Sequence, residues 1–201
     1  MARGRPRKFD EDAALTAAMV TFWEKGLAAT SLDDLAGAMG MNRPSIYAAF
    51  GNKEAIYRRS LARFCGQLDQ AVATTLEGAP ALRPGLVAFF DQAIEVYCSG
   101  EPAMGCLMIC TAPVEALSHP QVGDDLTALI HRLDDAFARR LRRAIREGEV
   151  DVDLPVRPTA QLLQGTLHTI ALRARSGAPR TSLRKMGRHA AATLVGPAPA
   201  S

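Results

Sequence analysis

Apolar residues recur along most of this chain at intervals of three and four, which is the spacing of one face of an α-helix. One such stripe follows Asn52 and consists of Tyr57, Leu61, Phe64, Leu68 and Val72. A second lies between about Asp124 and Glu147 and consists of Leu126, Ile130, Leu133, Phe137, Leu141 and Ile145. No segment shows the sustained alternation of a β-strand, and no internal repeat is present. The pattern predicts an all-α fold.

Capping residues and helix breakers divide the first third of the chain into short helices. Asp10 is a plausible N-cap for a helix that ends at Gly26, and Thr30 or Ser31 caps a second helix that ends at Gly40. A third short helix begins near Asn42, with Pro44 in its first turn, where the missing N–H has no cost. Asn52 caps the long fourth helix.

The remainder of the chain predicts further helices at about 83–99, 124–147, 156–175 and 180–194. Between the first two lies a sulfur-rich stretch, residues 104–117. The pattern therefore gives four parts: a flexible basic arm (1–9), a short helical domain (10–55), a larger helical domain (56–195) and a disordered tail (196–201).

Composition agrees with helices packed on helices. The chain is 48% hydrophobic but only 5% aromatic, whereas sheets draw on β-branched and aromatic residues. No apolar run approaches the roughly 18 residues that a membrane helix needs, and the charged N-terminus has no apolar stretch behind it, unlike a signal peptide. We therefore expect a cytoplasmic protein without a membrane partner, whose cysteines are reduced thiols: Cys65, Cys98, Cys106 and Cys110.

The positive charge is concentrated at the start of the chain. Residues 1–63 hold ten Lys and Arg against seven Asp and Glu, whereas residues 64–201 hold fourteen of each. A basic segment attached to a neutral body favours a phosphate-binding head with a ligand-binding or partner-binding remainder. Three charges are few, so the charge alone leaves nucleic-acid binding open.

Residues 30–50 have the layout of a helix-turn-helix, in which a second short helix with a polar start lies in the DNA major groove. Asn42, Arg43 and Ser45 suit base reading there, since Arg can bind guanine and Asn can bind adenine through paired hydrogen bonds. Tyr47 and Lys53 stand where a hydroxyl and an ammonium could hold phosphates, and Lys53 lies at a helix N-terminus, which attracts anions. The alternative is a helical hairpin in a bundle.

The same residues resemble the DNA-binding signature of the tetracycline-repressor (TetR) family over about residues 10–60. The resemblance rests on the runs Thr30–Ala36, Gly40–Tyr47 and Phe50–Glu54, and extends back through Ala14, Phe22 and Gly26.

The resemblance implies a role for each matching position. Thr30 and Ser31 would contact the DNA backbone, Arg43 and Ser45 would reach bases, Tyr47 would grip a phosphate, Lys53 would clamp the backbone, and Phe50 would be core. Two positions depart from the commoner pattern: Pro44 replaces a small residue and stiffens the helix, and Ala49 replaces a frequent large polar residue.

The arm adds a separate signal for DNA. Its Gly4-Arg5-Pro6 core, flanked by basic residues, resembles an AT-hook, which lies extended in a narrow A·T minor groove. A disordered basic tail with only nonspecific attraction is the alternative, and in both cases the residues that approach DNA are Arg3, Arg5, Arg7 and Lys8.

The resemblance also implies that residues past about 60 bind a ligand and form a homodimer through the last two long helices. Small residues there would allow close helix approach: Gly165, Ala171, Ala174, Gly187, Ala190 and Ala191. The candidate pocket for a small hydrophobic effector consists of the following residues, each of which taken alone is more typical of plain core: Phe89, Phe90, Ile94, Tyr97, Met104, Met108, Leu117, Phe137 and Leu163.

Cys106 and Cys110 would share a helix face, and Gly105-Cys106-Leu107 resembles a segment found in family members that sense oxidants, electrophiles or metals. A reactive thiol needs a lowered pKa, whereas buried cysteine is commonly a small hydrophobe. No two histidines have zinc-ligand spacing, so we expect no metal site and no cofactor.

Enzyme motifs are absent from the sequence: it contains no phosphate-binding loop, dinucleotide fingerprint, metalloprotease motif or nucleophile elbow. We therefore expect a ligand-responsive transcriptional regulator that acts as a repressor. It would bind a palindromic double-stranded DNA operator as a dimer, and a small hydrophobic effector would release it from the operator. The alternatives are a cysteine-based redox or electrophile sensor and a non-regulatory architectural DNA-binding protein.

Overall fold

The structure is a computed structural model that describes residues 10–196. Within that range the chain forms nine α-helices and one short π-helix and contains no β-strand, which confirms the all-α prediction. None of the helices in this range combines the length and apolar character needed to cross a membrane. The predicted basic arm, residues 1–9, and residues 197–201 of the predicted tail lie outside the described range.

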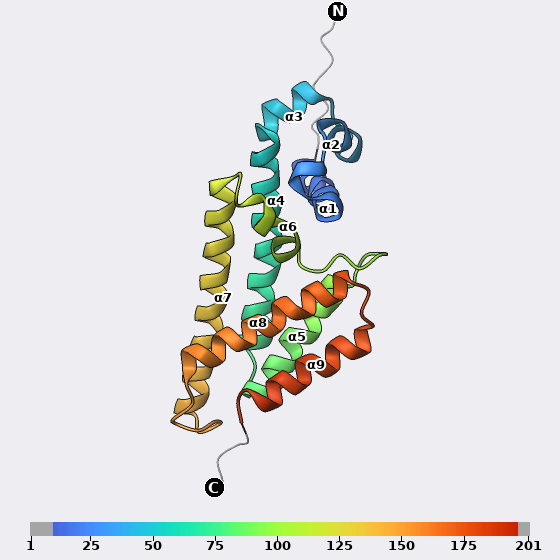
Figure 1. Ribbon diagram of the computed structural model, residues 1–201. Helices are drawn as coiled ribbons and strands as arrows, with labels where there is room; N and C mark the ends of the chain where they lie inside the picture. The colour runs from blue at the N-terminus through green and yellow to red at the C-terminus, as the bar shows by residue number, and fades with distance from the viewer. Residues whose placement is uncertain (1–9, 197–201) are drawn as a thin grey trace, which may run out of the picture. The chain divides into compact units, whose positions relative to one another are not determined.

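The chain divides into two compact units, which meet between Arg63 and Phe64. The first unit holds α1 (Glu11–Ala29), α2 (Leu32–Met39), α3 (Arg43–Phe50) and the first part of α4 (Lys53–Ala71). The second holds the rest of α4 and the elements after it (Figure 1): η1 (Val72–Glu77), α5 (Leu82–Tyr97), α6 (Leu107–Glu115), α7 (Pro120–Arg146), α8 (Val156–Arg175) and α9 (Arg180–Thr193).

The boundary between the units lies inside α4 rather than after residue 55. Two contacts tie the first part of α4 to α1. The rings of Phe22 and Tyr57 stand edge to face with centroids 5.2 Å apart, and Arg63 Nη2 donates to Asp12 Oδ2 at 2.8 Å. The first two turns of α4 after residue 55 therefore belong to the core of the first unit.

The prediction that the first helix ends at Gly26 was partly correct. Gly26 has φ +78° and ψ 176°, so helical geometry breaks there, and a residue with a Cβ rarely adopts such a φ. One further turn nevertheless continues to Ala29 before Ser31 caps α2. The seventh helix also differs, because Pro120 opens it four residues before the predicted start, a position at which the ring restricts φ to a helical value.

The second unit is a bundle in which α8 packs against α7, α5 and α9, and α5 lies between α8 and α9 (Figure 1). Aromatic residues fill its centre: the rings of Phe89 and Phe137 meet edge to face with centroids 5.5 Å apart. Burial of one such side chain contributes about 1.5–3 kcal/mol. Packing of this kind, rather than helix propensity, holds the bundle together.

A buried ion pair ties three segments of the second unit together. Arg140 in α7 is buried, and its Nη2 donates to Glu149 Oε1 at 2.9 Å. The other carboxylate oxygen of Glu149 accepts from the backbone N–H of Leu82, the first residue of α5. The pair therefore joins the end of α7, the loop that follows it and the start of α5.

Most small residues predicted at a dimer interface instead pack inside the chain. Ala171, Ala174, Gly187 and Ala191 are buried among helices of the same unit. A Cβ at Gly187 would lie 2.9 Å from the Cβ of Phe90, so this glycine lets α9 approach α5 closely. For these four positions the prediction was wrong, because the intrachain bundle already uses their small size.

Candidate nucleic-acid interface and effector cavity

The first unit contains two short helices joined by a tight turn, and local sequence explains each boundary. The Ser31 hydroxyl accepts from the N–H of Asp34, and Asp34 accepts from the N–H of Ser31, which completes a capping box. Gly40 closes α2 in the left-handed conformation with φ +62°. Asn42 then caps α3 by accepting from the N–H of Ser45 at 2.9 Å. The predicted helix-turn-helix geometry is therefore present.

The recognition helix α3 buries one side and exposes the other. Ile46 and Phe50 are buried against the rest of the unit, as predicted for Phe50. The exposed side carries polar or rigid residues predicted to contact DNA: Arg43, Pro44, Ser45 and Tyr47. Tyr47 is 49% exposed although it is a large aromatic residue. An exposed tyrosine beside an arginine is an arrangement that suits phosphate and base contacts.

Arg43 forms a paired interaction with an aspartate on the helix before it. Its Nε donates to Asp33 Oδ1 at 2.9 Å and its Nη2 to Asp33 Oδ2 at 2.5 Å. Hydrogen bonding to the Asp33 carboxylate raises the pKa of Arg43, because the pair stabilises the charged guanidinium. No role for Asp33 was predicted from the sequence. The only signal was an acidic residue ten positions before the arginine, across a turn that brings two helices together.

Other predicted contacts also have partners within the unit. Ser31 and Asn42 are exposed but serve as helix caps, so each has only its remaining hydrogen-bonding capacity available for DNA. Thr30 is 1% exposed, and its hydroxyl donates to Gly26 O at 2.6 Å. The prediction that the Thr30 side chain contacts the DNA backbone is therefore wrong, because the side chain supports the break at Gly26 instead.

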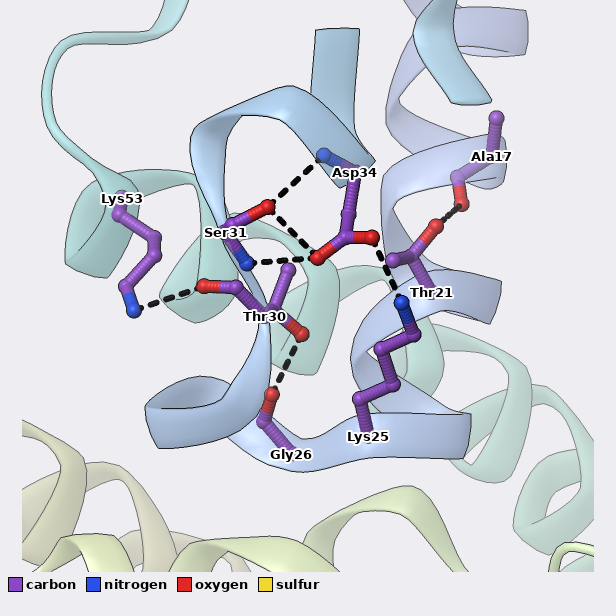
Figure 2. Close-up of polar contacts among 8 residues, drawn as sticks. All are labelled: Ala17, Thr21, Lys25, Gly26, Thr30, Ser31, Asp34 and Lys53. Carbon is purple, nitrogen blue, oxygen red and sulfur yellow. Dashed lines mark hydrogen bonds and ion pairs between the residues drawn. The ribbon is translucent and has the colours of Figure 1, made fainter. Parts of the chain in front are cut away.

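Lys53 is also held from within the first unit. Its Nζ donates to Leu27 O and to Thr30 O, both at 2.8 Å, and Figure 2 shows the contact to Thr30. The ammonium therefore satisfies carbonyl groups at the end of α1, which a helix C-terminus otherwise leaves unpaired. Nearby, Lys25 pairs with Asp34 at 2.6 Å and lowers the pKa of that carboxyl. A phosphate contact by Lys53 stays a prediction, beside this structural role.

The four basic residues of the arm, Arg3, Arg5, Arg7 and Lys8, lie outside the described residues. Their AT-hook interpretation therefore stays a prediction.

The second unit contains a cavity of about 210 Å³ between the end of α4 and α5. Its lining is mostly apolar, with two glutamine side chains and one phenol: Phe64, Gln67, Leu68, Ala71, Gln92, Ala93, Val96 and Tyr97. Of the nine residues predicted to line a pocket, Tyr97 is the one that lines this cavity. The stripe on α4 was visible in the sequence, but nothing there indicated that it would line a space rather than fill one.

The other predicted pocket residues have different positions. Leu117 is 91% exposed, at the end of α6, and cannot line an interior cavity. Met104 is half-buried in the segment before α6, where its carbonyl accepts from Arg175 Nη1 at 3.0 Å. The remaining six are buried and do not line this cavity, and their role in effector binding stays a prediction: Phe89, Phe90, Ile94, Met108, Phe137 and Leu163.

The segment that carries Cys106 and Cys110 is packed tightly against α8. Gly105 has φ +69°, and a Cβ there would lie 2.5 Å from Ala171 O and 2.9 Å from Cys110 Sγ. Cys106 follows directly and is the N-cap of α6. The two cysteines are therefore close in space, but the glycine before them is fixed by close packing.

Burial dominates the chemistry of these thiols. Desolvation raises the pKa of Cys106 to about 12, although N–H groups at the start of α6 and the Tyr97 hydroxyl partly oppose it. Desolvation also raises the pKa of Cys110. Tyr97 hydrogen-bonds to Cys106, and burial raises the pKa of this phenol well above its usual value. Both thiols are thus protonated in this conformation, and the described residues contain no cluster suited to a metal ion.

The sequence and structure of the chain match regulators of one family. Residues 14–59 match the family described as bacterial regulatory proteins, tetR family. The HTH-type transcriptional repressor ComR of Escherichia coli (strain K12) is 30% identical over 194 residues, which cover 96% of this chain and 91% of ComR. The repressor BdcR of the same strain is 33% identical over 53% of this chain and 54% of its own length.

A solved structure is similar over nearly the whole chain. It is the TetR family regulator CifR, in a variant with cysteines replaced, in complex with a 26-base-pair double-strand operator DNA. It is 33% identical with a TM-score of 0.86, and the match covers 94% of this chain and 98% of CifR. The paired short helices, the polar face of α3 and these similarities agree. The chain belongs to the TetR family of DNA-binding regulatory proteins, and it is a transcriptional regulator rather than an enzyme.

Proposed function

We propose that this regulator is a repressor that reads a palindromic operator through the exposed face of α3. The observation that carries the proposal is the placement of Arg43, Ser45 and Tyr47 on that face, while Ile46 and Phe50 anchor it. Repression is the activity named for its relatives ComR and BdcR. The compartment we assign is the cytoplasm, where operator DNA is found.

The test is enrichment of duplexes from a random-sequence library, followed by affinity measurements with variants. Arg43→Ala should cost about 1–3 kcal/mol on the enriched duplex and relax base preference at one position. Arg142→Ala removes the same charge from an exposed position on α7 in the second unit and should leave the preference unchanged. If Arg43→Ala retained the full preference, α3 would not be the reading helix.

We propose that the chain acts as a homodimer, because a palindromic site presents two half-sites about 34–36 Å apart. Support comes from α8, where Leu162 and Leu172 are 57% and 51% exposed. Gly165 and Thr169 lie between them on the same helix face, at spacings of three, four and three. This stripe is a continuous apolar and small surface, of the kind that helices bury against a partner.

Two substitutions test the dimer surface. Leu162→Glu with Leu172→Glu should yield a monomer in analytical ultracentrifugation and abolish operator binding at nanomolar protein. Leu117→Glu replaces a leucine that is more exposed but lies outside this stripe, and it should leave the mass unchanged. A dimer that persists in the double variant would place the interface elsewhere.

We propose that the cavity between α4 and α5 binds the effector. Its volume of about 210 Å³ is below the roughly 300–1,000 Å³ of sites that hold drug-sized ligands. The lining of aromatic and aliphatic groups with two amides suits a small, neutral, largely apolar molecule that carries a hydrogen-bonding group. Such a ligand releases DNA only if it binds the DNA-incompetent conformation more tightly.

A cavity-filling substitution separates effector binding from DNA binding. Ala93→Phe should abolish release of the enriched duplex by small aromatic alcohols such as benzyl alcohol, while operator affinity persists. Ala88→Phe, on the exposed side of the same helix, is the matched control. Release that survives in Ala93→Phe would exclude this cavity as the effector site.

A thiol-sensing regulator is the second candidate, and one observation favours it: Cys106 hydrogen-bonds to Tyr97, a residue of the cavity wall. The pKa of about 12 for Cys106 means that such sensing requires a conformation in which the thiol is more exposed. Oxidant-driven release of DNA that is lost in Cys106→Ser with Cys110→Ser would favour this candidate. Release by neutral ligands that persists in that variant would favour the cavity.

A further inference from the structure

The contact between Arg43 and Asp33 occupies the hydrogen-bonding edge that an arginine uses for DNA. Arg43 is the first residue of α3, and Asp33 is the second residue of α2. The two parallel bonds, 2.9 Å and 2.5 Å long, engage Nε and Nη2 of the guanidinium. The same fork binds a guanine edge or a phosphate. Asp33 and DNA therefore compete for one group.

The Arg43–Asp33 pair contributes little to the stability of the fold. The Arg43 and Asp33 side chains are 55% and 74% exposed, and an exposed pair contributes only about 0–1 kcal/mol to stability. The cap of α2 is complete without Asp33, because Ser31 and Asp34 form it. The negative charge of Asp33 can still interact favourably with the positive N-terminal end of the α2 dipole. Its two hydrogen bonds, however, go only to the residue at the head of the recognition helix.

We propose that Asp33 is a specificity-determining residue that acts through Arg43, an inference that rests on the proposed reading role of α3. On DNA without the preferred sequence, a phosphate offers Arg43 no better partner than the Asp33 carboxylate, so the pair persists in the nonspecific complex. Nonspecific binding therefore gains little from this arginine. On the preferred sequence, a base edge that accepts both bonds compensates for the lost pair. Because the pair with Asp33 must break only on the operator, Asp33 lowers operator affinity more than nonspecific affinity.

The test compares wild type with Asp33→Asn on two probes. One is a duplex enriched from a random library by the wild-type protein, and the other is the same duplex with its sequence scrambled. Asp33→Asn should raise affinity for the enriched duplex more than for the scrambled duplex, so the ratio of enriched-duplex to scrambled-duplex affinity rises. In Asp33→Asn the freed Arg43 should also gain one phosphate contact on the scrambled duplex. Raising the salt from 50 to 200 mM should therefore reduce the affinity of the variant for this duplex by a factor about 3.5-fold larger than for the wild type.

Two controls separate this role from a general charge effect. Glu11→Gln removes the carboxylate of another exposed arginine pair in the same unit, with Arg59, and should leave the affinity ratio near its wild-type value. In an Arg43→Ala background, Asp33→Asn should have no further effect on the ratio. An effect that persists there, or that Glu11→Gln reproduces, would overturn the proposal.

The outcomes also distinguish this inference from the function on which it rests. If the wild-type protein does not discriminate between the two duplexes, the reading role of α3 fails. If the wild type discriminates and Asp33→Asn preserves both the ratio and the salt dependence, only the role of Asp33 fails. Circular dichroism and thermal unfolding of each variant confirm that the helices are intact.

Discussion

Gly187→Ala is a sharp test of the packing between α9 and α5. The added Cβ would lie 2.9 Å from Phe90 Cβ, 3.2 Å from Cγ and 3.4 Å from Cδ2. The nearest of these atoms is the one joined to the backbone of α5, so a change of side-chain rotamer cannot relieve the contact. Relief requires a shift of α9 away from α5, and overpacking of this kind costs about 1–3 kcal/mol.

A second effect opposes the first, and a matched variant isolates it. Alanine is more favourable than glycine within a helix by about 0.8–1 kcal/mol. Gly66→Ala in α4 should show this gain alone, because nothing lies within 4 Å of a Cβ at that position. The difference in free energy of unfolding between the two variants should therefore be about 1–3 kcal/mol, with Gly187→Ala the less stable.

The assay is urea unfolding followed by circular dichroism at one fixed protein concentration, because oligomerisation shifts apparent stability. Trp23, the only tryptophan of the sequence, lies in the first unit, so its fluorescence reports that unit separately. The destabilisation should appear in the dichroism transition of the second unit. If Gly187→Ala were as stable as Gly66→Ala, the conclusion that α9 packs against α5 too closely to admit a Cβ at position 187 would be wrong.

Three further results are expected. Glu149→Gln leaves the buried Arg140 charge uncompensated and should destabilise the second unit by about 3–5 kcal/mol, while the added change Arg140→Met should restore most of that loss; additive losses would contradict the pairing. Lys53→Met removes two charge-assisted hydrogen bonds to the end of α1 and should cost about 1.5–3 kcal/mol in the Trp23 transition, and an unchanged transition would refute this role. Burial raises the pKa of Cys106 to about 12 from a usual value of 9.0. Iodoacetamide at pH 8 should therefore label this thiol about a thousand-fold more slowly in native protein than in urea, and the native rate should rise with pH. Equal labelling rates in the two states would show that the thiol is exposed.

Helix boundaries were largely predictable because they depend on local chemistry. Asn42 and Gly40 act through groups within a few residues of themselves, and the structure places both at the predicted caps. The exposed face of α3 was predictable for the same reason, since Ile46 and Phe50 fix which side is buried.

The failed predictions concern contacts between segments far apart in the sequence. The partners of Arg43 and Lys53 come from other helices or from the end of α1, and no local pattern specifies such partners. The cavity poses the same difficulty: an apolar stripe predicts burial, but whether neighbours fill all the space depends on side-chain packing across α4 and α5. Six of the predicted pocket residues are buried but do not line this cavity.

The close approach of Gly105 to α8 limits how any chemistry at the adjacent cysteine can be accommodated. Not even one methyl group fits at position 105, where it would meet the carbonyl of Ala171 at 2.5 Å, and the Cys106 side chain is itself buried. A covalent adduct on that sulfur would add several atoms beside this tight contact, and close-packed interiors respond by moving whole elements rather than by compressing. Modification of one sulfur atom would then be converted into separation of α6 from α8.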